Sequence, residues 1–362
     1  MGGLETYVRE LLPALLARDE RLEITVFVTA AGREALAQEP WADRVRFQTP
    51  GILRVPAMKA LAELTVVGRL ADAAGAQIVH SIAMIGPVRS RAASVVTLAD
   101  VIWLREPDAV PALTRLLWRT AVPLGARHAR RVITLSEASR REISEDLGLD
   151  PSRIDVVPLG PGAAVAGEAT DEAELRARHG LGDGPIVLTS SAHSPHKNVG
   201  ALIEAMPAVR EAVPGAVLVV PGNVTEHTRG LEARAAELGL GSGVVFAGWV
   251  SAADLEGLYG AAACFAFPSR HEGFGLPVLE AMSRGVPVAC ANASALLEVA
   301  GDAALFFSPD RPDELAAAVT RVLQDASLAE TLRNSGRERA ATFSWDRVAE
   351  ETHAVYAKAL AG

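Results

Sequence analysis

Short runs of β-branched and aromatic residues alternate with longer stretches of helical periodicity along the whole chain. This alternation limits the fold more than any other feature, because strands that alternate with helices form parallel sheets covered by helices. The sequence therefore predicts an α/β fold. The predicted strands span 22–29, 45–49, 76–81, 94–100, 131–136 and 155–159 in the first half, and 185–191, 216–222, 244–250, 264–269, 287–292 and 304–308 in the second.

The length favours two domains, because 362 residues exceed what one hydrophobic core usually supports. Prolines and glycines within 158–162 interrupt any regular element and mark a linker. We expect two doubly wound, Rossmann-like domains, at 1–162 and 163–362, with a cleft between them. The last helix, at about 346–360, is expected to pack back toward the first domain.

The chain opens with Gly2 and Gly3, which lead directly into a helical stretch. A doubly wound domain normally begins with a strand that feeds such a glycine turn. The first strand of the N-terminal domain is therefore predicted to be missing. Because a missing central strand leaves ladder groups unpaired, a chain extended upstream by about ten residues is expected to be more stable.

Charge and cysteine content exclude several classes of partner. The formal net charge is −9, which argues against nucleic acid, since nucleic-acid binding needs a basic surface. Cys264 and Cys290 lie in apolar runs and are expected to be buried thiols, so we predict no metal site. No cofactor is expected either. Neither a secretion signal nor a membrane-spanning run is visible, and a cytoplasmic location is expected.

Residues that follow the predicted strands are the candidates for a site, because ligands of open α/β sheets bind outside the carboxyl ends of the strands. These candidates are His80, Asp100 and Ser136 in the first half, and Ser191 to Lys197, Gly222, Val250 and Ser269 to Leu276 in the second.

The turn HEGFGL after the strand at 264–269 carries the strongest signal. Its glycines allow backbone N–H groups to approach a ligand, and Pro277 fits the first position of a helix whose N-terminus attracts phosphate. Glu272 lies in the turn and Glu280 lies about one helical turn further on. Ionised carboxylates only accept hydrogen bonds, so the pair predicts a ligand with phosphates and hydroxyls, such as a nucleotide diphosphate sugar. The alternative is that Glu280 only interacts with the helix dipole and Glu272 is a solvated loop residue.

A second anion-binding feature is the loop SSAHSPHKN. Lys197 precedes the next helix there and can supply a mobile positive charge to a diphosphate. His193 and His196 in the same loop are weaker candidates, because a histidine in such a loop is more often an ordinary surface residue.

The chain resembles the retaining glycosyltransferases of family 4, which have the GT-B architecture. The residues that carry the resemblance are the E-x7-E pair in EGFGLPVLEAMSRGVPV (Glu272 and Glu280), the SPHKN loop with Lys197, and GWVSAADLEGLYGAA. In the first half GGLETYVRELLPAL, TLADVIWLREPDA and ITLSEASRREI also fit. The resemblance covers essentially the whole chain.

This resemblance implies a metal-independent enzyme that moves a sugar from GDP-mannose or a UDP-sugar to a hydroxyl of a glycan, glycolipid or natural product. The second domain would hold the donor and the first would face the acceptor. Glu280 would hold the ribose hydroxyls, Glu272 the donor-sugar hydroxyls and Lys197 the diphosphate. Further donor contacts are implied for Gly2, Gly3, Ser191, Val250, Gly273, Phe274, Gly275 and Leu276.

In the first half His80 and Asp100 would orient hydroxyl groups, although His80 can equally be a packing residue. Ala99 stands where relatives usually have a histidine, and Ser191 where many have an arginine. Ala99 and the missing strand favour an alternative, a protein that binds nucleotide sugar without turnover. A pyridoxal-dependent phosphorylase is disfavoured by the small number of lysines, and a nicotinamide enzyme by the absence of G-x-G-x-x-G after any strand.

The segment 111–131 is basic and amphipathic, and its arginines are Arg115, Arg119, Arg127, Arg130 and Arg131. Such a segment can dock on an anionic membrane that bears a lipid-linked acceptor. The alternative is a core-packed helix with a solvated arginine face, so peripheral membrane contact stays open.

Overall fold

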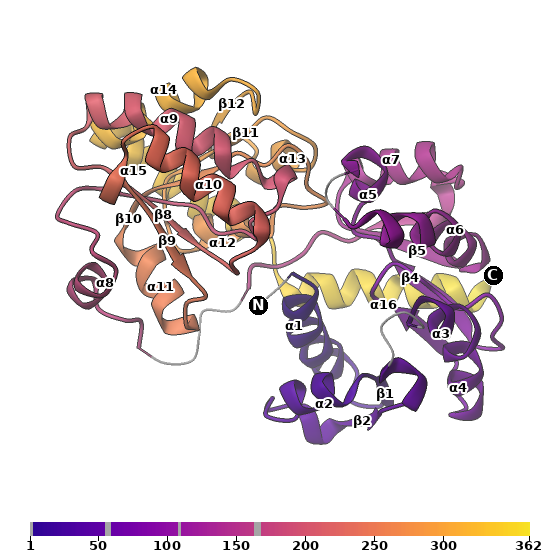
Figure 1. Ribbon diagram of the computed structural model, residues 1–362. Helices are drawn as coiled ribbons and strands as arrows, with labels where there is room; N and C mark the ends of the chain where they lie inside the picture. Colours follow the sequence, from indigo (N-terminus) through magenta and orange to yellow (C-terminus); the bar gives the residue numbers. More distant parts are fainter. Residues whose placement is uncertain (1–2, 55–58, 108–109, 163–167) are drawn as a thin grey trace. The chain divides into compact units, whose positions relative to one another are not determined.

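The computed structural model describes residues 3–54, 59–107, 110–162 and 168–362. It consists of two compact units, one formed by Met1–Gly160 with Ser344–Gly362 and the other by Pro161–Phe343 (Figure 1). Both units contain parallel sheets and helices, which confirms the predicted α/β class. Each of the twelve predicted strand segments overlaps an observed strand. Residues 163–167, which directly follow the linker predicted at 158–162, lie outside the described residues.

The first unit has two separate parallel ladders in the described part of the chain, one ordered β1-β2 and the other β3-β4-β5-β6. These strands are β1 (Ile24–Phe27), β2 (Val45–Gln48), β3 (Ile78–Ser81), β4 (Ala93–Thr97), β5 (Arg131–Thr134) and β6 (Ile154–Val156). Its helices are α1 (Gly3–Arg18), α2 (Ala30–Leu36), α3 (Lys59–Thr65), α4 (Val67–Ala73), α5 (Ile102–Arg105), α6 (Ala112–His128), α7 (Glu137–Leu147) and α16 (Trp345–Ala361).

The two ladders share a small hydrophobic cluster although no described pairing joins β1 to β3. Phe27 of β1 packs against buried residues that include Val79 of β3. In the common doubly wound order 3-2-1-4-5-6, the first strand lies between the second and the fourth. The interruption between β1 and β3 therefore falls at the position that the sequence predicts to lack a strand.

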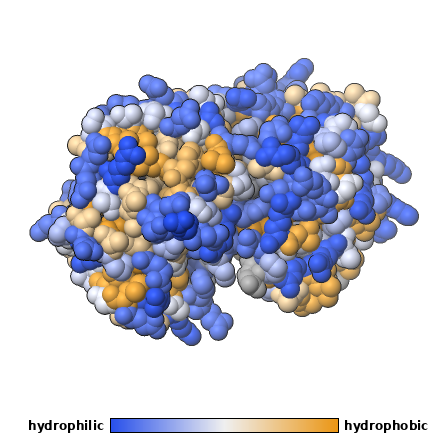
Figure 2. Space-filling view, turned by 90° about the horizontal axis from the view of Figure 1, so that it is seen from above, coloured by the Kyte–Doolittle hydropathy of each residue, from blue (hydrophilic) through white to orange (hydrophobic). Residues whose placement is uncertain are grey.

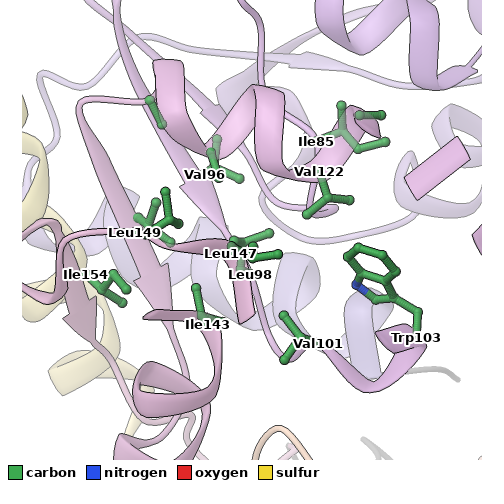
Figure 3. Packing of buried hydrophobic residues seen from close by; sticks show 14 residues of the cluster. Ile85, Val96, Leu98, Val101, Trp103, Val122, Ile143, Leu147, Leu149 and Ile154 are labelled. Carbon is green, nitrogen blue, oxygen red and sulfur yellow. The ribbon is translucent and has the colours of Figure 1, made fainter. Parts of the chain in front are cut away.

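The main core of the first unit lies between β4, β5 and the helices α6 and α7 (Figure 3). Trp103 is fully buried there and meets Trp118 of α6 edge-on, with ring centroids 6.3 Å apart. Helix α16, which ends the chain, belongs to this unit, where Trp345 contacts Tyr7 of α1 at a centroid distance of 6.2 Å.

The second unit contains one six-stranded parallel sheet ordered β12-β11-β10-β7-β8-β9. Its strands are β7 (Ile186–Leu188), β8 (Val217–Pro221), β9 (Val244–Gly248), β10 (Ala262–Phe267), β11 (Val288–Ala291) and β12 (Leu305–Phe307). Its helices are α8 (Glu172–His179), α9 (Val199–Ala212), α10 (Glu226–Glu237), α11 (Ala252–Ala261), α12 (Leu276–Ser283), α13 (Leu296–Ala300), α14 (Pro312–Gln324) and α15 (Ala326–Ala340).

The strand order changes direction between β7 and β10, because the chain proceeds from β7 to β8 and β9 on one side and from β10 to β11 and β12 on the other. Such a switch point leaves a crevice at the carboxyl ends of the two central strands. The loops that follow β7 and β10 are the two that carry Lys197 and Glu272.

The two cysteines lie in this sheet, Cys264 in β10 and Cys290 in β11, and both are buried free thiols, as predicted. Burial raises the pKa of Cys264 to about 12, and it raises the pKa of Cys290 as well. None of the described helices combines the length and the apolar character that crossing a bilayer requires. The face in Figure 2 is mostly hydrophilic, with separate hydrophobic patches.

Candidate functional site

The loop after β10 leads into α12 through a glycine with a left-handed backbone. Gly275 has φ +108°, and a Cβ at this position would lie 2.6 Å from Cδ2 of Leu296. Gly275 also precedes the first turn of α12, where no side chain caps the helix. Pro277 has no N–H, and the N–H groups of Val278 and Leu279 donate to the carbonyl of Gly275. The dipole of this helix end still creates positive potential directly after Glu272 and Phe274.

Lys197 and Glu272 form an ion pair that joins the two loops at the switch point. Nζ of Lys197 lies 2.6 Å from Oε1 of Glu272, and the side chains are only 18% and 10% exposed. Nζ also lies 5.8 Å from the centroid of the Phe267 ring, at the end of β10. The structure thus brings together a cation, a carboxylate and a helix N-terminus, and their contact with a nucleotide sugar stays a prediction.

Asn198 fixes the position of Lys197 from the next position in the chain. Its backbone is left-handed, with φ 56°, a conformation that asparagine tolerates better than most residues. Its buried side-chain Nδ2 donates to the carbonyl oxygens of Pro268 at 3.1 Å and Pro309 at 2.8 Å. Asn198 therefore ties the loop after β7 to those after β10 and β12. The sequence predictions do not include this role, although a polar residue between a proline turn and a helix indicates a helix boundary.

Ser294, in the loop after β11, holds the backbone of Glu272. The Glu272 N–H donates to Oγ of Ser294 at 2.8 Å, and this hydroxyl donates to the Glu272 carbonyl at 2.9 Å. Ser294 is not among the predicted site residues either, because no local pattern connects it with a residue 22 positions earlier.

Glu280 lies in α12 beside an aromatic ring and a guanidinium group. The hydroxyl of Tyr259 donates to its Oε2 at 3.4 Å, and Arg284 stacks on the Tyr259 ring, with 4.9 Å between guanidinium carbon and ring centroid. Nε of Arg284 donates to Glu256 at 2.7 Å. Burial raises the pKa of Glu280, while Arg284 and the Tyr259 hydroxyl act in the opposite direction.

This raised pKa predicts an acid limit for donor binding. If Glu280 must be ionised to accept ribose hydroxyls, affinity falls as the carboxyl takes up a proton, and this occurs above the usual pKa of 4.5. We expect the Kd of a nucleotide sugar to rise as the pH is lowered toward 4.5, with the rise beginning above that value, as measured by calorimetric titration. Glu280→Gln should bind more weakly at neutral pH and lack this dependence. An unchanged pH profile in the variant would contradict the assignment.

The other candidates of the second unit are distributed around the same edge of the sheet. Ser191 and Val250 follow β7 and β9 and are half-buried. Gly222 follows β8 with φ +148°, and a Cβ there would lie only 2.6 Å from the carbonyl oxygen of Ser191. A glycine is therefore required for these two loops to approach each other.

The two histidines of the loop after β7 differ in their surroundings. His193 is buried, and its Nδ1 hydrogen-bonds to Oγ1 of Thr228 at 2.9 Å, which indicates a structural role. His196 is half-buried, and its pKa is lowered to about 4, mainly by burial and further by Lys197. His196 is therefore neutral at neutral pH and adds no positive charge for a diphosphate.

In the first unit, His80 has partners at both ring nitrogens. Nδ1 hydrogen-bonds to the hydroxyl of Tyr356 and Nε2 to Oγ1 of Thr97, each at 2.8 Å. Burial lowers the pKa of His80 to about 4. These contacts favour the packing alternative for His80, and its contact with an acceptor remains a prediction.

The remaining candidates of the first unit lie at helix starts. Asp100 follows β4, and its Oδ1 accepts from the backbone N–H of Ile102 at 3.0 Å. Ser136 caps α7 by accepting from the N–H of Ser139 at 3.1 Å. Gly3 begins α1, and a Cβ added there would meet no atom within 4 Å, whereas Gly2 lies outside the described residues.

Two family models match the chain. Residues 171–339 match the model described as Glycosyl transferases group 1, and residues 1–160 match the one described as Glycosyltransferase Family 4. Each match falls almost entirely within one half of the sequence, and together they span both domains.

Curated relatives and solved structures agree with these matches. The chain is 33% identical to an MMP alpha-(1->4)-mannosyltransferase of Mycolicibacterium hassiacum, over 74% of this chain and 62% of the relative's length. It is 27% identical to a GDP-mannose-dependent alpha-(1-6)-phosphatidylinositol monomannoside mannosyltransferase of Mycolicibacterium smegmatis, over 93% of this chain and 89% of the relative. The structure of Anabaena Alr3699/HepE in complex with UDP and glucose superposes with a TM-score of 0.73 at 20% identity, covering 98% of this chain and 95% of that one.

Proposed function

We propose a function for this chain from one premise: it belongs to the group 1 glycosyl transferases, within glycosyltransferase family 4. The proposed reaction moves a sugar from a nucleotide diphosphate sugar to a hydroxyl acceptor and retains the configuration at the anomeric carbon. The observation that carries this proposal is the Lys197–Glu272 pair beside the uncapped start of α12, at the switch point of the second sheet.

The proposed chemistry is stabilisation of a leaving group. Negative charge grows on the diphosphate as the bond to the sugar breaks, and preorganised positive groups stabilise this charge. Nζ of Lys197 and the positive end of the α12 dipole provide such groups. Glu272 and Glu280 would accept hydrogen bonds from hydroxyls of the sugar and the ribose. The departing phosphate oxygen would take the proton of the acceptor hydroxyl.

For the donor we propose GDP-mannose first and a UDP-sugar second. Both curated relatives described above are named as mannosyltransferases, and one name specifies GDP-mannose, whereas Alr3699/HepE was solved with UDP and glucose. The test is a panel of nucleotide sugars, with binding measured by thermal shift and transfer to a panel of glycan, glycolipid and polyol acceptors measured by mass spectrometry. A product with one donor supports the enzyme. Tight donor binding without any transfer or hydrolysis would support the alternative of a binding protein, which Ala99 favours.

Sugar transfer is expected to survive chelation, because Lys197 and the start of α12 can supply the positive charge that a metal would otherwise provide. Initial rates should be the same within about twofold with and without excess EDTA. Loss of activity in EDTA, restored by a divalent ion, would contradict this metal-independent mechanism.

We also propose peripheral contact between α6 and an anionic membrane. One face of α6 is buried through Ala121 and Val122, whereas Leu113 and Leu116 on the other are 69% and 63% exposed. Leu117 and Leu124 extend this apolar row. Exposed leucines on a basic amphipathic helix are typical of interfacial binding. This leucine row favours membrane docking of α6 over the alternative, in which the exposed face of the helix carries only solvated arginines.

The leucine row predicts a measurable change in vesicle binding. Leu113→Ser with Leu116→Ser should weaken co-flotation with anionic vesicles by at least tenfold, because each leucine contributes about 1.5 kcal/mol or more on burial. The matched control is Leu61→Ser with Leu297→Ser, since both residues are exposed and neither lies on α6. Equal binding by the two double variants would contradict the contact.

A further inference from the structure

The first unit contains a basic pocket at the opposite end of its sheet from His80, Asp100 and Ser136. The pocket has a volume of about 470 Å³ and lies where β4 and β5 begin. Its lining includes Arg69, Asp72, Arg89, Arg91, Ser94 and Arg130. Because candidate acceptor residues lie at the carboxyl ends of the strands, a ligand of this pocket would be remote from them.

Positive charge dominates this pocket. Four arginines line it against one carboxylate, that of Asp72. Oδ1 of Asp72 already accepts from Oγ of Ser90 at 2.8 Å and from the N–H of Arg91 at 2.7 Å. In the part of the chain that the structure describes, the guanidinium groups of Arg69, Arg89 and Arg91 donate to no carboxylate. They are therefore available for an anion.

Ser94 provides a second and independent indication of a ligand. It is only 6% exposed, and its Oγ has no hydrogen-bond partner among the described residues. An unsatisfied buried hydroxyl costs about 1 to 3 kcal/mol, which an acceptor oxygen in the pocket would remove. Phosphate offers such oxygens, and its geometry matches the paired N–H groups of arginine.

The backbone around the pocket is closely packed. A Cβ at Gly68 in α4 would lie 2.1 Å from the carbonyl oxygen of Arg89. Helix α4 therefore rests directly on the segment that carries Arg89 and Arg91 and limits its movement. This support favours a built site over a chance group of surface arginines.

We propose that this pocket binds a phosphate group and that an anionic phospholipid supplies it. His128 also lines the pocket, and its Nδ1 hydrogen-bonds to the carbonyl of Leu124 at 2.8 Å. The pocket therefore adjoins the end of the leucine row of α6, so one lipid could place its headgroup in the pocket and its chains beside the leucines. Phosphate binding is independent of the proposed sugar transfer, whereas the lipid source depends on the proposed membrane contact.

The test compares two double variants. The pocket variant combines Arg89→Gln and Arg91→Gln, and the charge-matched control combines Arg33→Gln and Arg46→Gln. Both control residues are exposed arginines of the same unit. Partition onto phosphatidylcholine vesicles that contain phosphatidylglycerol should fall roughly thirty-fold in the pocket variant and by less than about threefold in the control. Ser94→Ala keeps every charge and should still weaken binding severalfold, which general electrostatic attraction does not explain.

A second arm uses inorganic phosphate and measures thermal stability. Suppose that millimolar phosphate stabilises the wild type but not the pocket variant, while the pocket and control variants bind vesicles equally. This result would support the phosphate site and contradict the lipid as its source. If neither phosphate nor vesicles distinguish the pocket variants from the controls, the proposal is wrong. Nucleotide-sugar binding should be unchanged in all these variants. A failure of the proposed sugar transfer can therefore be distinguished from a failure of the proposed phosphate pocket.

Discussion

Replacing Lys197 with alanine is expected to lower kcat by about 10²–10³-fold, the usual cost of removing one preorganised group that stabilises a leaving oxyanion. Nζ of Lys197 lies in an ion pair with Glu272, beside the uncapped start of α12. Its charge is held in place before the donor binds, so little reorganisation is needed as the diphosphate leaves. KM for the donor should change less than kcat, because most of the interaction develops in the transition state.

Lys59, one of the three lysines of the chain, provides a matched control for this prediction. Lys59→Ala removes the same charge from α3 in the other unit and should leave kcat unchanged within about twofold. Circular dichroism would establish that both variants remain folded. If the Lys197→Ala protein turns over at the wild-type rate, Lys197 does not stabilise the leaving diphosphate and the proposed mechanism is wrong.

Glu272→Gln separates the two partners of the pair. This variant keeps the size of the side chain but leaves Lys197 without its negative partner. Binding of free nucleoside diphosphate should be retained or strengthened, because Lys197 is then more available. Transfer should decrease, because an amide accepts hydrogen bonds from sugar hydroxyls less strongly than a carboxylate does.

The strands and the loop after β10 could be predicted from sequence because their signals are local. Each strand is a short apolar run between helical segments, and the turn that contains Glu272 and Gly275 is continuous in the chain. The rule that ligands bind at the carboxyl ends of strands then selected Lys197 as well. The proximity of Lys197 and Glu272, 75 residues apart, follows from the strand order rather than from any pattern in either loop.

The residues that sequence reasoning missed, or left between alternatives, depend on contacts distant in sequence. His80 is satisfied by Tyr356, 276 positions away on α16, so a strand-end histidine alone could not reveal its partner. By sequence Glu280 lies about one turn into a helix, and only the fold places Tyr259 and Arg284 around it. Asn198 and Ser294 hold loops together through carbonyl groups, which leave no trace in side-chain chemistry.

Asn198→Ala is expected to lower the free energy of unfolding by about 3 to 5 kcal/mol, as measured by urea denaturation. The carbonyl groups of buried Pro268 and half-buried Pro309 lose their donor. An unsatisfied buried carbonyl costs about 1 to 3 kcal/mol, and that of Pro309 is expected at about the lower end of this range. The left-handed backbone, with φ 56°, adds about 1 kcal/mol, because a Cβ without a compensating polar group disfavours it. Since Asn198 adjoins Lys197, kcat should fall as well.

Asn198→Gly separates these two causes. Glycine adopts the left-handed backbone freely, so this variant should lose only the hydrogen bonds and be about 1 kcal/mol more stable than the alanine variant. If both variants are equally unstable, backbone strain contributes nothing at this position. If stability falls but kcat does not, Asn198 supports the fold without positioning Lys197. A fall in kcat at a temperature where both variants remain fully folded would instead mean that the loops after β7, β10 and β12 must be joined for Lys197 to meet the diphosphate.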